Sequence, residues 1–127
     1  MSIKYKLIEK GQPGVAGGGT KKWYASIVTD GELDIDDIVK QIEKFSALSE
    51  ADIRGVVIAV ENVIQEALAD SKIVRLDKLG TFYPTLSSGG AVTEKDFNQS
   101  LIKSAGVNYR PGKRILDTIK SKGFEKK

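Results

Sequence analysis

The side chains best suited to chemistry in this 127-residue sequence are cations, and they gather in its C-terminal half. Residues 71–127 contain twelve Lys or Arg against five Asp or Glu, whereas residues 30–70 contain three basic and eleven acidic side chains. Residues 1–29 contain five Lys and one Glu, so the three segments carry net charges of +4, −8 and +7 in chain order. This asymmetry is typical of proteins that bind polyanions; the alternative is a charge distribution that serves solubility alone.

Catalytic side chains are scarce, because the sequence contains no histidine and no cysteine. A zinc site of the usual kind, a Ser-His or Cys-His nucleophile pair and a disulfide therefore cannot be built. The carboxylate pairs Asp36 with Asp37 and Asp30 with Glu32 lack a nucleophile and a base at recognisable spacing, so we interpret them as helix-capping and solvated loop charges. We expect no enzyme activity, no cofactor, no metal and no small-molecule substrate.

A glycine cluster near the N-terminus raises the question of a phosphate-binding loop. The nucleotide-binding pattern requires Gly, four residues and then Gly-Lys-Ser/Thr at the start of a helix. Here residues 14–19 are followed by Thr20-Lys21-Lys22 and a predicted strand, so we expect no nucleotide site. Gln12-Pro13-Gly14 and the glycines instead predict a turn with a mobile tip.

The composition indicates one folded domain outside the membrane. Hydrophobic residues make up 40% and charged residues 29% of the chain, which is ordinary for a globular protein. No apolar run reaches the length of a membrane span, and Met1 to Lys10 alternates charge with hydrophobe instead of forming a signal-peptide core. We therefore expect a cytoplasmic protein.

Two alternating segments, residues 3–8 and 23–28, predict a β-hairpin at the N-terminus. Trp23 is expected to pack on the inner face of this hairpin. In the alternative, Trp23 stacks on nucleic acid beside Lys21 and Lys22.

Two helices are predicted next. Asp34 can cap a first helix over residues 35–45, and Ser49-Glu50 marks a break before a longer helix over residues 53–68. The second helix is apolar over more than one narrow stripe, since Ile58 and Ala59 widen it. Such a helix needs a second surface, and we expect a homodimer to provide it, with a larger single core as the alternative.

The remaining elements are predicted to be mainly strands. Alternation over residues 73–76 and 79–83 predicts two strands, or one strand bent at Gly80, and residues 106–110 predict another. Between them, residues 93–103 predict a short helix in which Phe97 packs in the core. A final helix is expected to begin at Pro111, because its missing amide is harmless in a first turn.

The order of these elements and two short motifs resemble the family of HU and integration host factor, from about Asp34 to Lys122. The first motif is Leu79-Gly80-Thr81-Phe82, similar to the glycine-centred strand bend of that family. The second is Arg110-Pro111-Gly112-Lys113, similar to the segment that leads into its closing helix. By resemblance, the structural residues are Gly80, Phe82, Pro111 and Gly112.

The resemblance implies an α+β fold with a helical hairpin, an antiparallel sheet saddle with an arm, and a C-terminal helix. It implies an intertwined homodimer in the nucleoid that binds double-stranded DNA through phosphate and minor-groove contacts with little base specificity. Cationic side chains of the saddle and arm are then the candidate DNA contacts. They are Arg75, Lys78, Lys95, Lys103, Arg110, Lys113 and Arg114.

Two features depart from the common pattern of the family. The arm lacks an Arg-Asn-Pro wedge and has only Pro84 at its root, so any bending of DNA would rest on charge or on Phe97. Residues 1–30 form an extension, similar to extended HU-like variants of gut-type bacteria, which we expect to pack on residues 31–127 as one domain. A protein-interaction or structural module that has lost DNA binding is the alternative function.

Overall fold

The computed structural model describes residues 1–12 and 14–127, and it contains helices and sheets built mainly of antiparallel strands, as the predicted α+β class requires. Its residues group into two compact units, one of residues 35–115 and one of residues 1–34 with 116–127. The turn predicted at Gln12-Pro13-Gly14 includes Pro13, which lies outside the described residues. Among the residues that the structure describes, no helix combines the length and apolar character of a membrane span.

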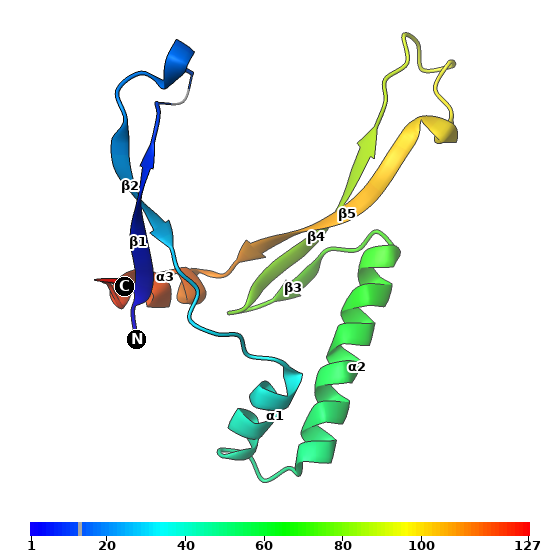
Figure 1. Cartoon of the computed structure of the whole chain (residues 1–127). Helices are drawn as coiled ribbons and strands as arrows, with labels where there is room; N and C mark the ends of the chain where they lie inside the picture. Colours follow the sequence, from blue (N-terminus) through cyan, green and yellow to red (C-terminus); the bar gives the residue numbers. More distant parts are fainter. Residues whose placement is uncertain (13) are drawn as a thin grey trace. The chain divides into compact units, whose positions relative to one another are not determined.

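The unit of residues 35–115 begins with the predicted helical hairpin, α1 (Ile35–Glu43) and α2 (Glu50–Ala69), which contact each other (Figure 1). Ser49 caps α2, because its hydroxyl accepts a hydrogen bond from the Asp52 amide at 3.2 Å. Val39 of α1 and Ile53 of α2 are almost completely buried. The two helices therefore share a small apolar core.

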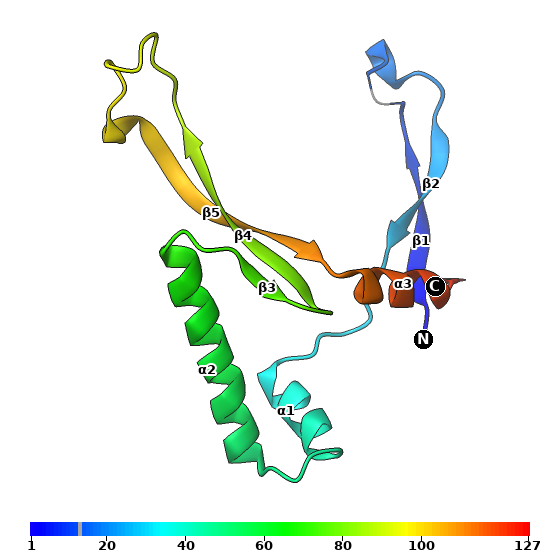
Figure 2. The ribbon, with the colours of Figure 1, turned by 180° about the vertical axis from the view of Figure 1, so that it is seen from behind.

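A three-stranded antiparallel sheet follows, in the order β3 (Val74–Leu76), β4 (Gly80–Ser88) and β5 (Ile102–Pro111). Its two faces differ in character, because paired residues point the same way and neighbours along a strand point oppositely. One face carries apolar rows such as Val74, Phe82 and Tyr109, and the opposite face is polar. Helix α2 contacts β3 and β4 (Figure 2).

The bend predicted at the start of β4 is a close crossing of backbones. A side chain on Gly80, where φ is +126°, would stand 2.3 Å from the Arg110 carbonyl oxygen. A side chain on Gly112 would stand 2.3 Å from the Lys78 carbonyl oxygen, and the Gly112 amide donates to the Leu79 carbonyl at 3.2 Å. Only glycine leaves room at these two points.

Aromatic packing supports the same corner of the sheet. The rings of Phe82 and Tyr109, which are cross-strand partners, lie 5.0 Å apart between centroids. The Tyr109 hydroxyl donates a hydrogen bond to the Leu79 carbonyl. This pair ties the turn between β3 and β4 to β5.

Strands β4 and β5 continue into an arm whose far end differs from the prediction. The helix predicted over residues 93–103 is wrong: this described connection contains a hydrogen-bonded turn at residues 94–96 and a short 3-10 turn, η2 (Gln99–Leu101), and Ile102 already begins β5. The Asn98 carboxamide accepts from the Ser100 amide at 2.8 Å, and such side-chain bonds favour turns over helix. Phe97 is 41% exposed in this chain, so its predicted burial is also wrong.

Helix α3 (Lys113–Ser121) begins two residues later than predicted. Pro111 is the last residue of β5, where it pairs with Gly80, and is not the first residue of the helix. Gly112, where the two backbones approach closely, separates the end of β5 from the start of α3.

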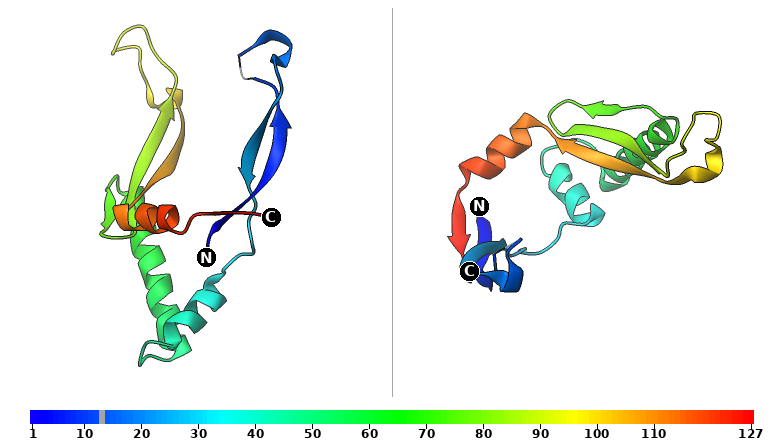
Figure 3. Two further views of the ribbon diagram at one scale, coloured as in Figure 1. Left: turned by 90° about the vertical axis from the view of Figure 1, so that its left-hand side faces the viewer. Right: turned by 90° about the horizontal axis from the view of Figure 1, so that it is seen from above.

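The other unit contains the predicted N-terminal hairpin, β1 (Ile3–Lys10) and β2 (Lys22–Ile27), with the short 3-10 turn η1 (Ala16–Gly18) between them (Figure 3). An unpredicted strand, β6 (Phe124–Lys126), pairs in parallel with β1, so the last residues of the chain group with the first. This compact unit therefore contains both the predicted hairpin and the last twelve residues of the sequence. Trp23 is 65% exposed, so its expected inner packing is wrong for this chain.

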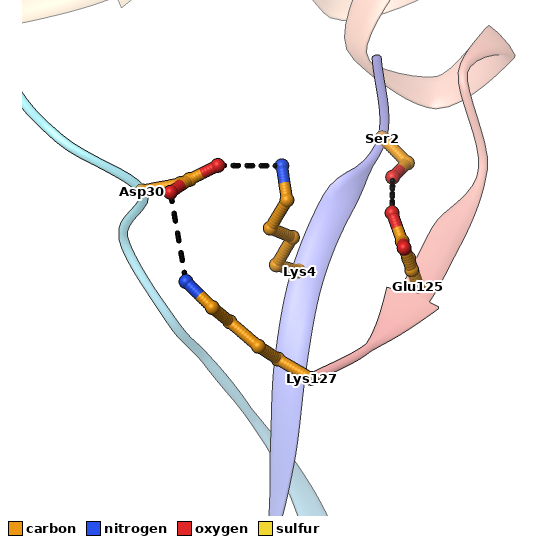
Figure 4. Close-up of polar contacts among 5 residues, drawn as sticks. All are labelled: Ser2, Lys4, Asp30, Glu125 and Lys127. Atoms are coloured by element: carbon orange, nitrogen blue, oxygen red, sulfur yellow. Dashed lines mark hydrogen bonds and ion pairs between the residues drawn. The ribbon is translucent and has the colours of Figure 1, made fainter.

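Ion pairs hold the ends of this small sheet together (Figure 4). Asp30 binds the Lys4 ammonium at 2.9 Å and that of Lys127 at 3.5 Å, and the Ser2 hydroxyl donates to Glu125 at 2.9 Å. The hydrogen bond from Lys4, aided by the charge of Lys127, lowers the pKa of the Asp30 carboxyl. The same bond raises the pKa of Lys4.

Candidate nucleic-acid interface

The polar face of the β3–β4–β5 sheet brings two of the predicted cations together. Arg75 on β3 pairs with Thr81 on β4, and Thr81 pairs with Arg110 on β5. Directly paired residues project from the same face, so both arginines flank Thr81 on that face, about 10 Å apart at the backbone. Both arginine side chains are exposed.

A tyrosine and an amide extend this row. Tyr83 lies two residues beyond Thr81 and pairs with Asn108, which places both on the same face as the arginines. The Arg110 guanidinium carbon lies 5.3 Å from the centre of the Tyr83 ring, a cation–π contact that orients the guanidinium. We call Arg75, Thr81, Tyr83, Asn108 and Arg110 the arginine face.

The arginine face is electropositive because its strands carry no acidic side chain that would neutralise the arginines. Strands β4 and β5 contain no Asp or Glu. Within the described part of the chain, neither Arg75 nor Arg110 forms an ion pair. Exposed guanidinium groups beside hydroxyl and amide donors suit phosphate oxygens, which accept several hydrogen bonds at once.

Three further predicted cations lie near the ends of these strands. Lys78 is in the turn between β3 and β4, and its carbonyl approaches Gly112. Lys113 and Arg114 are the first two residues of α3, directly after that glycine. All three are exposed, so the turn and the start of α3 extend the positive charge beyond the sheet.

The last two predicted cations are not part of the arginine face. Lys95 lies in the connection between β4 and η2. Lys103 lies at a register shift, where Ser87 pairs with Ser104 but Ser88 pairs with Ile102. Both are exposed along the arm, away from the row of arginines.

Tyr83 and Asn108 were not among the predicted site residues, although the sequence contains a signal for them. From Thr81 to Ser87 β4 alternates polar or amphipathic side chains at odd positions with apolar ones at even positions. Extending that alternation from Arg110 back along β5 would have placed Asn108 on the arginine face.

Known structures and families provide an independent comparison. A solved structure from Bacteroides vulgatus, described as that of a candidate bacterial DNA-binding protein, resembles this chain with a TM-score of 0.71 at 15% identity. The match covers 98% of this chain and 48% of the other, so this chain spans about half the length of that relative. No curated protein sequence matches the chain.

The family comparison covers nearly the whole chain. Residues 1–126 match the HU-HIG family, described as an HU domain fused to a wHTH, Ig or glycine-rich motif. The helical hairpin, the antiparallel sheet with its arm and the closing helix are the elements that the resemblance to HU implies. The chain therefore belongs to the HU-HIG family and has an HU-like fold.

Proposed function

We propose that this protein binds double-stranded DNA as a non-enzymatic, architectural homodimer. The contacts are mainly to the phosphate backbone and the minor groove, with little base specificity. The observation that carries the proposal is the arginine face, on which Arg75 and Arg110 flank Thr81 on an exposed surface without acidic residues on β4 or β5. Membership of an HU-like family and the described role of the Bacteroides vulgatus relative support it.

The remaining predicted DNA contacts are also exposed cations. Lys78, Lys113 and Arg114 continue the positive charge at the turn and at α3, and Lys95 and Lys103 continue it along the arm. An interface made mostly of cations and phosphates distinguishes poorly among sequences, because phosphates carry no sequence information. A location in the cytoplasm, on the nucleoid, belongs to the same proposal.

A homodimer is proposed because α2 leaves apolar side chains uncovered. Val56, Val60 and Val63 lie at helical spacing on one stripe and are 56%, 44% and 66% exposed. Burying one such side chain is worth roughly 1.5–3 kcal/mol, so covering this stripe with a second copy would stabilise a dimer substantially. Two copies also double the number of arginine faces available to one duplex.

The test is a salt series with a duplex, a single-stranded DNA and an RNA, followed by fluorescence anisotropy of the labelled nucleic acid. We expect duplex binding that weakens steeply with salt. The variant Arg75→Gln/Arg110→Gln removes two cations from each protomer. The fall of log affinity with log salt should become less steep, by about 4 in slope per dimer. Binding should weaken by a similar factor on unrelated sequences.

The matched control is Lys40→Gln/Lys44→Gln, which removes the same charge from exposed positions on and just after α1. It should leave the slope nearly unchanged. Equal losses in the two variants would mean that net charge, and not the arginine face, governs binding. A protein with no salt-dependent duplex binding would instead favour the protein-interaction module.

A further inference from the structure

The sheet of β1, β2 and β6 also has two faces of different character. Ile3, Tyr5 and Leu7 alternate with Lys4, Lys6 and Ile8 along β1, and the paired residues of β2 and β6 follow the same alternation. One face is mostly apolar and includes Trp23, Ala25, Ile27 and Phe124. The opposite face carries Lys4, Lys6, Ile8, Lys10, Lys22, Tyr24, Ser26 and Glu125.

Two of these lysines are direct cross-strand partners, since Lys10 pairs with Lys22. Their β-carbons are therefore about 4.5–5.5 Å apart on the same face, an arrangement of like charges that destabilises a sheet. Lys6 projects from the same face, four residues along β1. The hairpin thus keeps a repulsive cluster of cations that its own folding does not need.

The acidic residues of the sheet itself do not pair with these lysines. Glu125 accepts a hydrogen bond from Ser2, Glu9 pairs with Trp23 and so projects from the opposite face, and Asp30, just beyond β2, binds Lys4 and Lys127. Within residues 1–12 and 14–127, Lys6, Lys10 and Lys22 form no ion pair, and all three are exposed. An anionic partner is what would convert this repulsion into binding free energy.

We propose that Lys6, Lys10, Lys22 and Tyr24, the lysine face, form a second surface that binds the phosphate backbone of double-stranded DNA. This inference rests on the proposed function. A β-strand places Lys6 and Lys10 about 13 Å apart, a span of roughly four base-pair steps along a duplex. The Tyr24 ring, 38% exposed, lies between them on the paired strand and can donate its hydroxyl to phosphate.

A duplex fits this face better than a single strand does. Proteins that bind single strands stack successive bases on several aromatic side chains. On the lysine face, Tyr24 is the one aromatic residue among the paired positions of β1, β2 and β6, and Trp23 projects from the opposite face. Charge without a row of aromatic rings is the pattern suited to a phosphate backbone.

The experiment compares the full chain with Lys6→Gln/Lys10→Gln/Lys22→Gln in anisotropy titrations of a labelled 40-base-pair duplex across a salt series. The fall of log affinity with log salt should become less steep, by about 2.7 in slope for each protomer bound. Affinity near 150 mM salt should drop at least about tenfold. The charge-matched control, Lys40→Gln/Lys44→Gln/Lys126→Gln, should change neither quantity appreciably. Its Lys126 lies in the same sheet, on the opposite face.

Two further readouts separate binding from a structural role. Lys10→Gln relieves repulsion from Lys22, so its thermal midpoint should equal or exceed that of the parent while its affinity falls. Trp23, the sole tryptophan, reports on the opposite face of the sheet. Its fluorescence should therefore change little when duplex is added.

The outcomes also separate this inference from the proposed function. If the arginine variants weaken duplex binding and the lysine triple variant does not, the lysine face is wrong and the arginine face stands. If the triple variant loses only single-stranded DNA or RNA, or if duplex strongly quenches Trp23, the assignment to duplex on this face is overturned. If the unmodified chain binds no duplex at any salt, both proposals fail.

Discussion

Gly80 and Gly112 allow two stretches of backbone to cross in close contact. A β-carbon at either position would lie 2.3 Å from a carbonyl oxygen of the backbone, which cannot rotate away as a side chain can. We expect Gly112→Ala to destabilise the protein by about 2–3 kcal/mol, measured by chemical denaturation. Gly55→Ala is the control: nothing lies within 4 Å of its added carbon inside α2, so it should stabilise by about 1 kcal/mol.

A second residue-scale effect depends on pH. A hydrogen bond with Glu50 raises the pKa of the Glu43 carboxyl above its ordinary value of 4.5, and the neighbouring negative charge acts in the same direction. A raised folded-state pKa stabilises the fold fully below the unfolded pKa, and this contribution disappears as pH rises through the folded pKa. Glu43→Gln cannot ionise, so its thermal midpoint should exceed that of the parent increasingly from pH 4 to pH 7.

Circular dichroism melts over that pH range check the prediction. Glu61→Gln, which removes a charge from α2 away from the Glu43 and Glu50 pair, is the control. A parallel increase in both variants would point to the general acidity of residues 30–70 instead of to this pair.

At the scale of elements, the sequence predicted what local pattern determines. Apolar spacing located α1 and α2, the Ser49 cap separated them, and alternation located β1, β2 and the two strands around Gly80. The wrong helix at residues 93–103 had suitable spacing, and Thr93 does accept a hydrogen bond from the Asp96 amide as an N-cap would, but Asn98 then accepts from the Ser100 amide in a turn. Competition of this kind depends on geometry that spacing does not encode.

Long-range pairing was the other limit on prediction. Strand β6 has three residues, too few for a periodic signal, and it exists because β1 provides a free edge. The exposed Trp23 has the same origin, since alternation identifies a face but not whether another surface covers it. For the candidate site, charge alone suggested Arg75 and Arg110, whereas the strand register was needed to add Tyr83 and Asn108.

At the scale of the whole molecule, the proposed dimer makes a prediction about α2. Val60→Asp places a charge in the stripe that a second copy would bury, so the dimer dissociation constant should rise at least about a hundredfold. Analytical ultracentrifugation measures this directly. Gln65→Asp, on the opposite side of the helix, should leave association unchanged.

Duplex affinity of the same two variants tests how assembly and binding are connected. If one duplex engages both protomers, Val60→Asp should weaken DNA binding although it touches no predicted contact. A monomeric parent protein would remove the dimer from the proposal, and undiminished DNA binding by a dissociated Val60→Asp variant would show that one protomer suffices.

The parallel pairing of β6 with β1 has a consequence for the order of assembly. Ser2 and Glu125 are 123 positions apart, so their meeting closes all the intervening residues into one loop. Closing so long a loop from an unfolded state costs on the order of 4 kcal/mol of free energy. The contacts of a three-residue strand alone do not offset that cost. Hairpins and helices formed earlier shorten the effective loop, which makes the seam between β1 and β6 the last contact to form during folding and the first to open under stress.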